Sequence, residues 1–228
     1  MTREAGSTTT LLVGALLLRL AVTGAHRRYV RPGMGPWLIV AGVVLVLLGG
    51  AALVASLRRP VVADAHGHDH SERVGWVLLG PVVALLLIAP PALGSFAVDR
   101  TRIDVDPGGA TFSALAASDV AVPMTLLEFS QRAVDRDGAS FDGQPVTLTG
   151  FVLRDADGDG FRIARYQIAC CAADAAAAVV RVVDTGGTSP PADHWVTVTG
   201  TFHASDEITP ELRPTSVVEI APPGDPYE

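Results

Sequence analysis

The chain has 228 residues, 49% of them hydrophobic, and all 17 of its basic residues are arginine. Residues 1–95 carry eight arginines against four acidic residues, whereas residues 96–228 carry nine against twenty, so an apolar half of net charge +4 precedes an acidic half of net charge −11. This balance argues against a nucleic-acid partner, because phosphate binding needs a cationic surface. It predicts a helical membrane region at 1–95 and a separate soluble domain.

Three apolar runs, at about 9–25, 36–57 and 75–93, predict three transmembrane helices. A helix needs about 20 apolar residues to cross the hydrocarbon core, which the second and third runs supply. The first run is shorter and contains Arg19, close enough to its end for the side chain to reach the interface. A signal peptide is the alternative for this run, but its basic leader is thin and two further runs follow. We therefore expect a multi-pass protein in the lipid bilayer of the cell membrane.

A histidine-rich loop at 64–72 separates the second and third runs. Its imidazoles, from His66, His68 and His70, alternate with Gly67 and Asp69. Such spacing suits a borderline metal such as Zn²⁺ or Cu²⁺. The alternative is a solvated polar loop that only connects two helices.

Residues 96–120 are polar and rich in small side chains, which predicts a tether between the membrane region and a soluble domain at 121–228. The domain opens on a pattern typical of a short amphipathic helix at about 125–136, with Gly138 near its C-terminal end.

Alternation of side chains then predicts five short strands, at 145–155, 160–169, 178–184, 194–202 and 215–221. The count favours a small all-β domain, a five-stranded OB-like barrel with one or two short helices, although a sandwich fragment fits as well. The first two strands form a hairpin through "DADGDG", which resembles the start of a calcium loop at Asp155, Asp157 and Asp159. A tight polar turn is the favoured interpretation, because position twelve of that loop is Tyr166, not glutamate.

The only two cysteines, Cys170 and Cys171, are adjacent. Neighbouring Cα atoms lie about 3.8 Å apart, below the roughly 4.4 Å that a disulfide needs, so a bridge between them is disfavoured. In a strand the two side chains would point to opposite faces, so sharing a metal requires a turn, where Asp174 can join them. His194 and His203 are candidates to complete such a site, with Zn²⁺ as the candidate metal.

The simpler interpretation, which the sequence slightly favours, is that the two cysteines fill a tight corner of the core. Thiol oxidoreductases generally use C-x-x-C, and no nucleophile or nucleotide signature accompanies the pair. We therefore expect no enzyme.

Several motifs resemble one family over nearly the whole chain. They are "HDH" at 68–70, "ALGS" at 92–95, "RYQIACCAAD" at 165–174, "DHWVTVTG" at 193–200 and "PPGDPYE" at 222–228. Together they are similar to the YcgQ-like family of permease subunits. The resemblance implies a membrane protein that partners a YcgR-like permease, with a link to metal homeostasis, and it assigns no catalytic residue. The "AAAA" that follows Asp174 departs from the family pattern.

The expected function is thus an accessory subunit of a bacterial permease that anchors an OB-like domain beside the pore. The motivation is that Arg19 is the one ionisable residue inside the apolar runs, too few for an ion path. The alternative is a membrane-anchored metal-binding or thiol redox module. Arginines near the membrane divide almost evenly between the two sides, so the acidic domain alone leads us to place the C-terminal domain outside the cytoplasm, with the N-terminus and the histidine-rich loop inside.

Overall fold

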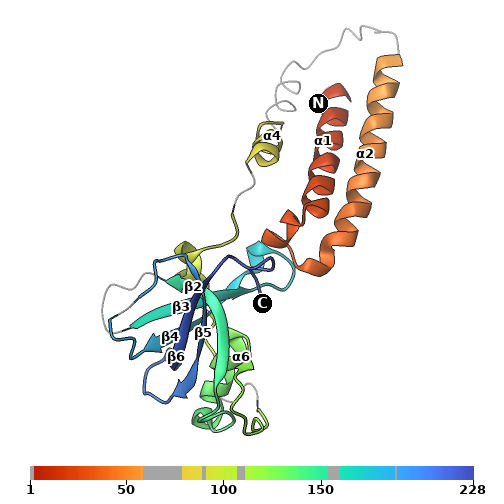
Figure 1. Ribbon diagram of the computed structural model, residues 1–228. Helices are drawn as coiled ribbons and strands as arrows, with labels where there is room; N and C mark the ends of the chain where they lie inside the picture. The colour runs from red at the N-terminus through yellow and green to blue at the C-terminus, as the bar shows by residue number, and fades with distance from the viewer. Residues whose placement is uncertain (1–2, 59–78, 89–90, 107–110, 154–159, 188) are drawn as a thin grey trace. The chain divides into compact units, whose positions relative to one another are not determined.

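A computed structural model describes residues 3–58, 79–88, 91–106, 111–153, 160–187 and 189–228. The chain divides into two compact units, Met1–Pro91 and Ala92–Glu228. In Figure 1 the helices of the first unit run from red to yellow, and the strands of the second from green to blue. Each unit has its own packing.

The first unit is helical. Its elements are α1 (Arg3–Val22), η1 (Ala25–Arg28), η2 (Pro32–Met34), α2 (Gly35–Arg58) and α4 (Leu79–Leu87). Two stretches of the described residues, Ala5–Val22 and Pro32–Arg58, form helices long and apolar enough to cross a membrane, with mean hydropathies of 1.6 and 2.8. Threonine hydroxyls inside α1 donate to backbone carbonyls one turn earlier, at 2.8 Å for Thr9 and 2.9 Å for Thr10, so they remain satisfied in an apolar setting.

Glycines let α1 and α2 approach closely. Gly42 and Gly49 are buried one heptad apart on α2, in line with Gly35, as expected for two helices that cross at a small angle. A Cβ on Gly49 would lie 2.7 Å from the backbone nitrogen of Leu11, and one on Gly14 would lie 2.9 Å from the carbonyl oxygen of Gly42. The two helices therefore pack backbone against backbone.

The prediction of three spans is not supported. Within 75–93, the described residues form only α4, nine residues long, which as a helix covers about 14 Å at 1.5 Å per residue and falls short of a bilayer core. The run contains three prolines, Pro81, Pro90 and Pro91, and a proline lacks the amide donor that an interior helical residue needs. The first run forms its helix earlier than predicted, at Arg3–Val22. The histidine-rich loop lies outside the described residues.

The second unit is a six-stranded mixed sheet, and its described residues also form two short α-helices, α5 (Val98–Thr101) and α6 (Leu126–Val134), which confirms a mainly β C-terminal domain. The strands are β1 (Val122–Pro123), β2 (Val146–Leu153), β3 (Gly160–Gln167), β4 (Ala176–Val183), β5 (Trp195–His203) and β6 (Glu211–Ile220). The predicted hairpin is present, since β2 and β3 pair antiparallel with Phe151 opposite Ala164. The "DADGDG" turn itself, with its alternative as a calcium loop, falls almost wholly outside the described residues.

The strand order is β1-β2-β3-β4-β6-β5, and β2 also pairs antiparallel with β5. Among themselves, the five strands β2 to β6 therefore each pair with two others, and β4 and β6 run parallel. The larger core cluster contains alternate residues of these strands, including Leu148, Ile163 and Val198. Helix α6 (Leu126–Val134) packs on it through Leu126 and Phe129.

A second cluster lies on another face of the sheet, where Phe151 stacks on Tyr166 and contacts Trp195. The chain entering this unit covers the cluster: Val98 is buried in it, and Gly94 accepts a hydrogen bond of 2.9 Å from the Tyr166 hydroxyl. Residues 92–98, partly predicted as tether, thus pack on the domain.

Candidate metal site at the paired cysteines

The paired cysteines lie in the turn between β3 and β4. β3 ends at Gln167, and a short 3-10 helix, η5 (Ala172–Asp174), precedes β4. The turn is organised by Asp174, whose carboxylate accepts hydrogen bonds from the backbone amides of Ala169, Cys170 and Cys171 at 2.8, 2.9 and 3.0 Å. Because these amides follow the end of a strand, the carboxylate supplies the acceptor that the sheet no longer provides.

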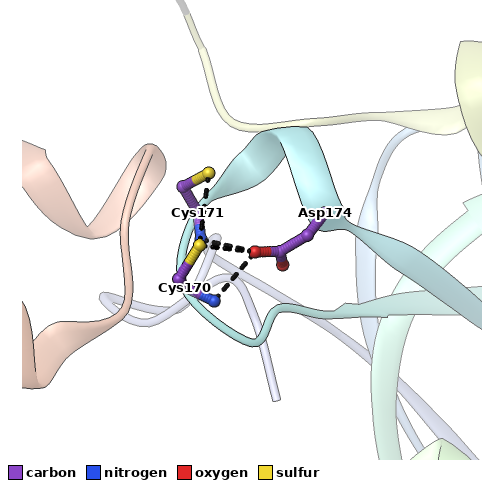
Figure 2. A group of neighbouring side chains, drawn as sticks. All are labelled: Cys170, Cys171 and Asp174. Carbon is purple, nitrogen blue, oxygen red and sulfur yellow. Dashed lines mark hydrogen bonds between the residues drawn. The ribbon is translucent and has the colours of Figure 1, made fainter.

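This turn brings three potential metal ligands together. The Sγ atoms of Cys170 and Cys171 are 3.7 Å apart, and the Cys170 thiol donates to Oδ2 of Asp174 at 2.8 Å. All three ligand atoms lie within 4.8 Å of one another. Figure 2 shows the three side chains gathered at the turn. The adjacent cysteines avoid opposite faces because β3 has already ended and the chain is turning.

The sulfur spacing suits a tetrahedral cation. Two thiolates bound to Zn²⁺ at about 2.3 Å and at the tetrahedral angle lie about 3.8 Å apart. The observed 3.7 Å agrees with that value, and it is far from a disulfide, which joins sulfurs at about 2.05 Å. Oδ2 of Asp174 lies only 2.8 Å from Sγ of Cys170, because the thiol proton forms a hydrogen bond between the two atoms. A metal would replace that proton, which is the usual course when thiols become ligands.

The electrostatics of the turn keep Cys170 protonated without a cation. Its hydrogen bond to Asp174 raises the pKa of the Cys170 thiol to about 11, and the neighbouring Cys171 thiol adds to the effect. The same hydrogen bond, together with the three backbone amides, lowers the pKa of Asp174 far below its usual range. Cys170 therefore lacks the thiolate character of a catalytic cysteine.

The strand that leads into the turn is fixed by the C-terminal segment. The backbone amide of Glu228 donates to the carbonyl of Tyr166 at 2.9 Å. Its side-chain carboxylate, almost fully buried, accepts from the backbone amide of Leu126 at 3.1 Å and from Gln167 at 2.9 Å, and it lies 3.7 Å from Arg165. The base of the turn is therefore held on both sides. The role of Glu228 could not be predicted from the sequence, because no local pattern signals a contact between residues so far apart.

The other predicted ligands do not join this group. Nδ1 of His194 contacts Glu219 at 2.6 Å, and Nε2 of His203 lies 4.0 Å from Glu211. In the part of the chain that the structure describes, only Cys170, Cys171 and Asp174 form a cluster of this kind. His66, His68 and His70 lie outside that part.

The interpretation of the cysteines as core filling is wrong. Cys170 is exposed and Cys171 is half-buried, whereas the core at this end of β3 stops at Ile168. The two side chains emerge at the surface because the Asp174 hydrogen bonds turn the backbone outward after Ile168.

Comparison with known proteins identifies two domains of one family. The DUF1980 N-terminal domain matches residues 8–106, and the DUF1980 C-terminal domain matches residues 129–228. No curated protein matches the chain. The cysteine turn lies inside the second matched range.

Proposed function

We propose that this chain, which carries both domains of the DUF1980 family, is a membrane-anchored metal-binding protein. The C-terminal domain binds a thiophilic divalent cation, of which Zn²⁺ is the example, through Cys170, Cys171 and Asp174. The observation that carries the proposal is the spacing of these ligand atoms, all within 4.8 Å on an exposed turn. The apolar α1 and α2 serve as the membrane anchor.

Binding is favoured over thiol redox catalysis at this turn. A catalytic thiol needs a lowered pKa, and the pKa of Cys170 is raised by its hydrogen bond to Asp174. Adjacent cysteines also form a strained disulfide. The carboxylate of Asp174, which makes the thiolate of Cys170 unfavourable, attracts a divalent cation.

The test is the metal content of the full chain in detergent micelles under reducing conditions. Because His66, His68 and His70 can also bind zinc, the measurement uses a variant with all three changed to alanine. We expect one equivalent of Zn²⁺ after dialysis, lost in Cys170→Ser and in Cys171→Ser. Asp184→Asn, an exposed aspartate elsewhere on the domain, is the control and should retain the metal. Unchanged zinc content in both cysteine variants would refute the site.

We further propose that the anchor works with a separate permease, as the YcgQ-like resemblance implies. The supporting observation is that α1 from Ala5 and α2 contain only two charged residues, Arg19 and Arg58, each in a last turn. Such a hairpin offers no polar path for an ion. Flux of a metal ion into liposomes that contain this chain alone would contradict the proposal, whereas co-purification with a multi-span protein from native membrane would support it.

The closed circuit of strand pairing supports a finer assignment of the fold. We propose that β2 to β6 form the five-stranded Greek-key barrel of the OB type that the sequence predicts, with β1 as an added strand. The support is the order β2-β3-β4-β6-β5 with β2 and β5 also paired, because closure removes the free edges of a sheet.

A further inference from the structure

The cysteine turn supplies few metal ligands and is open to solvent. Zn²⁺ in structural sites is held by four protein groups, whereas sites with three protein ligands keep a position for an exogenous group. Within the described residues the turn supplies three, and His194 and His203 contact glutamates elsewhere on the domain. Cys170 and Asp174 are exposed, so one side of any bound ion faces solvent.

One of the three ligands, Asp174, forms the weakest bond to a metal. The carboxylate of Asp174 has three backbone amide donors directed at it, from Ala169, Cys170 and Cys171. These hydrogen bonds reduce the electron density that the carboxylate can give to a metal. They also stabilise the carboxylate when it is free, so its metal bond breaks at a lower cost than a bond to either thiolate.

From this arrangement, and resting on the proposed metal binding, we infer that the turn is a transfer site, which passes its metal to a thiolate or imidazole of an acceptor. The acceptor group first bonds to the metal at the solvent side, and the bond to Asp174 then breaks. Further acceptor groups replace Cys171 and Cys170 in turn. Each departing thiolate regains one proton, which comes from an acceptor thiol or, where the acceptor is a neutral imidazole that releases none, from solvent, so charge and protons balance without a redox step.

The experiment follows release from the zinc-loaded full chain in micelles, again with His66, His68 and His70 changed to alanine. The probe is the chromophoric chelator 4-(2-pyridylazo)resorcinol, whose pyridine and azo nitrogens stand in for the acceptor. Transfer through direct attack makes the observed rate rise linearly with chelator concentration. A rate independent of chelator concentration means that the ion must leave first, and it overturns the inference.

A matched variant tests the leaving ligand. Asp174→Asn should still load with zinc through the two thiolates but should transfer it several-fold faster at each chelator concentration, whereas Asp184→Asn should transfer at the wild-type rate. Equal rates for wild type and Asp174→Asn would overturn the role given to Asp174. If the wild-type chain holds no zinc before mixing, the proposed function itself fails, so the two failures are distinguishable.

Discussion

Asp174 shows how one carboxylate can build a turn and define its chemistry. Its hydrogen bonds to three consecutive amides place the cysteine sulfurs on the same side of the chain, which an extended strand cannot do. The adjacency of the cysteines and the presence of Asp174 three residues later could be predicted from the sequence. The exposure of Cys170 could not, because the sequence pattern does not show where the core ends.

Asp174 controls the reactivity of Cys170 in the metal-free protein. The carboxylate accepts the thiol proton and so raises the pKa of Cys170 to about 11. We expect Asp174→Asn to lower this pKa and to speed alkylation of Cys170 by iodoacetamide roughly tenfold, because the gain in thiolate exceeds the loss in nucleophilicity of each thiolate.

The rate is measured by peptide mass spectrometry with a chelator present, at about pH 8. The substitution Asp184→Asn serves as the charge-matched control and should leave the rate unchanged. A Cys170 rate that is the same in wild type and Asp174→Asn would show that the carboxylate does not hold the thiol proton.

Among the elements, the helical hairpin and the C-terminal segment depend on contacts of different kinds. α1 and α2 pack through glycines, where the absence of a side chain allows backbone contact. The C-terminal segment instead joins α6 to β3 by hydrogen bonds to a buried carboxylate. Each arrangement makes a separate prediction.

Substitution by alanine at two neighbouring glycines of α2 should have different effects on the stability of the helices. A Cβ on Gly49 would lie 2.7 Å from the Leu11 backbone nitrogen, whereas one on Gly50 would have nothing within 4 Å. We expect Gly49→Ala to lower the melting temperature of the helices in micelles, followed by circular dichroism. Gly50→Ala should keep or raise it, since alanine favours a helix by about 1 kcal/mol over glycine. Similar melting of both variants would rule out close packing at Gly49.

Glu228 should make the stability of the second unit depend on pH. Burial raises the pKa of Glu228 to about 7 from its usual 4.5, so between these values the folded chain binds the proton more tightly than the unfolded chain. The contribution of this group is therefore fully present below about pH 4.5 and is lost as the pH rises through about 7. We expect the melting temperature to fall between pH 5 and pH 8, by a few degrees more in wild type than in Glu228→Gln. Parallel pH profiles would assign the dependence to other groups.

Local patterns predicted some elements well and others poorly. Period-two alternation placed β2, β3, β4 and β5 to within two residues, because a half-buried strand imposes that pattern directly. Apolar length predicted a third span that the described residues do not support, and a count of apolar residues ignores what prolines do to a helix. The contact between Glu228 and Leu126 joins residues 102 positions apart, and no local signal encodes it.

At the scale of the whole molecule, the helical hairpin constrains topology. If α1 and α2 both cross the bilayer, the chain returns to the side on which it began, so Arg3 and Arg58, at the two ends of the hairpin, lie on one side. The C-terminal domain then shares that side with the N-terminus unless 75–93 crosses as well. The described nine residues of α4 do not favour such a crossing. The number of spans therefore decides whether the two ends of the chain lie together.

We predict that the C-terminal domain lies outside the cytoplasm. With two spans the N-terminus lies on that side too, whereas the three spans predicted from the sequence place it in the cytoplasm. Cys170 and Cys171 are the only cysteines, so a membrane-impermeant maleimide reports the side of the domain in intact cells without other substitutions. Labelling before permeabilisation supports this location, and the double variant Cys170→Ser, Cys171→Ser is the blank. In that blank, Thr2→Cys reports the N-terminus. Labelling of both the domain and Thr2→Cys in intact cells fits two spans. Labelling of the domain without labelling of Thr2→Cys would restore a third crossing. Protection of the domain until permeabilisation would place it in the cytoplasm.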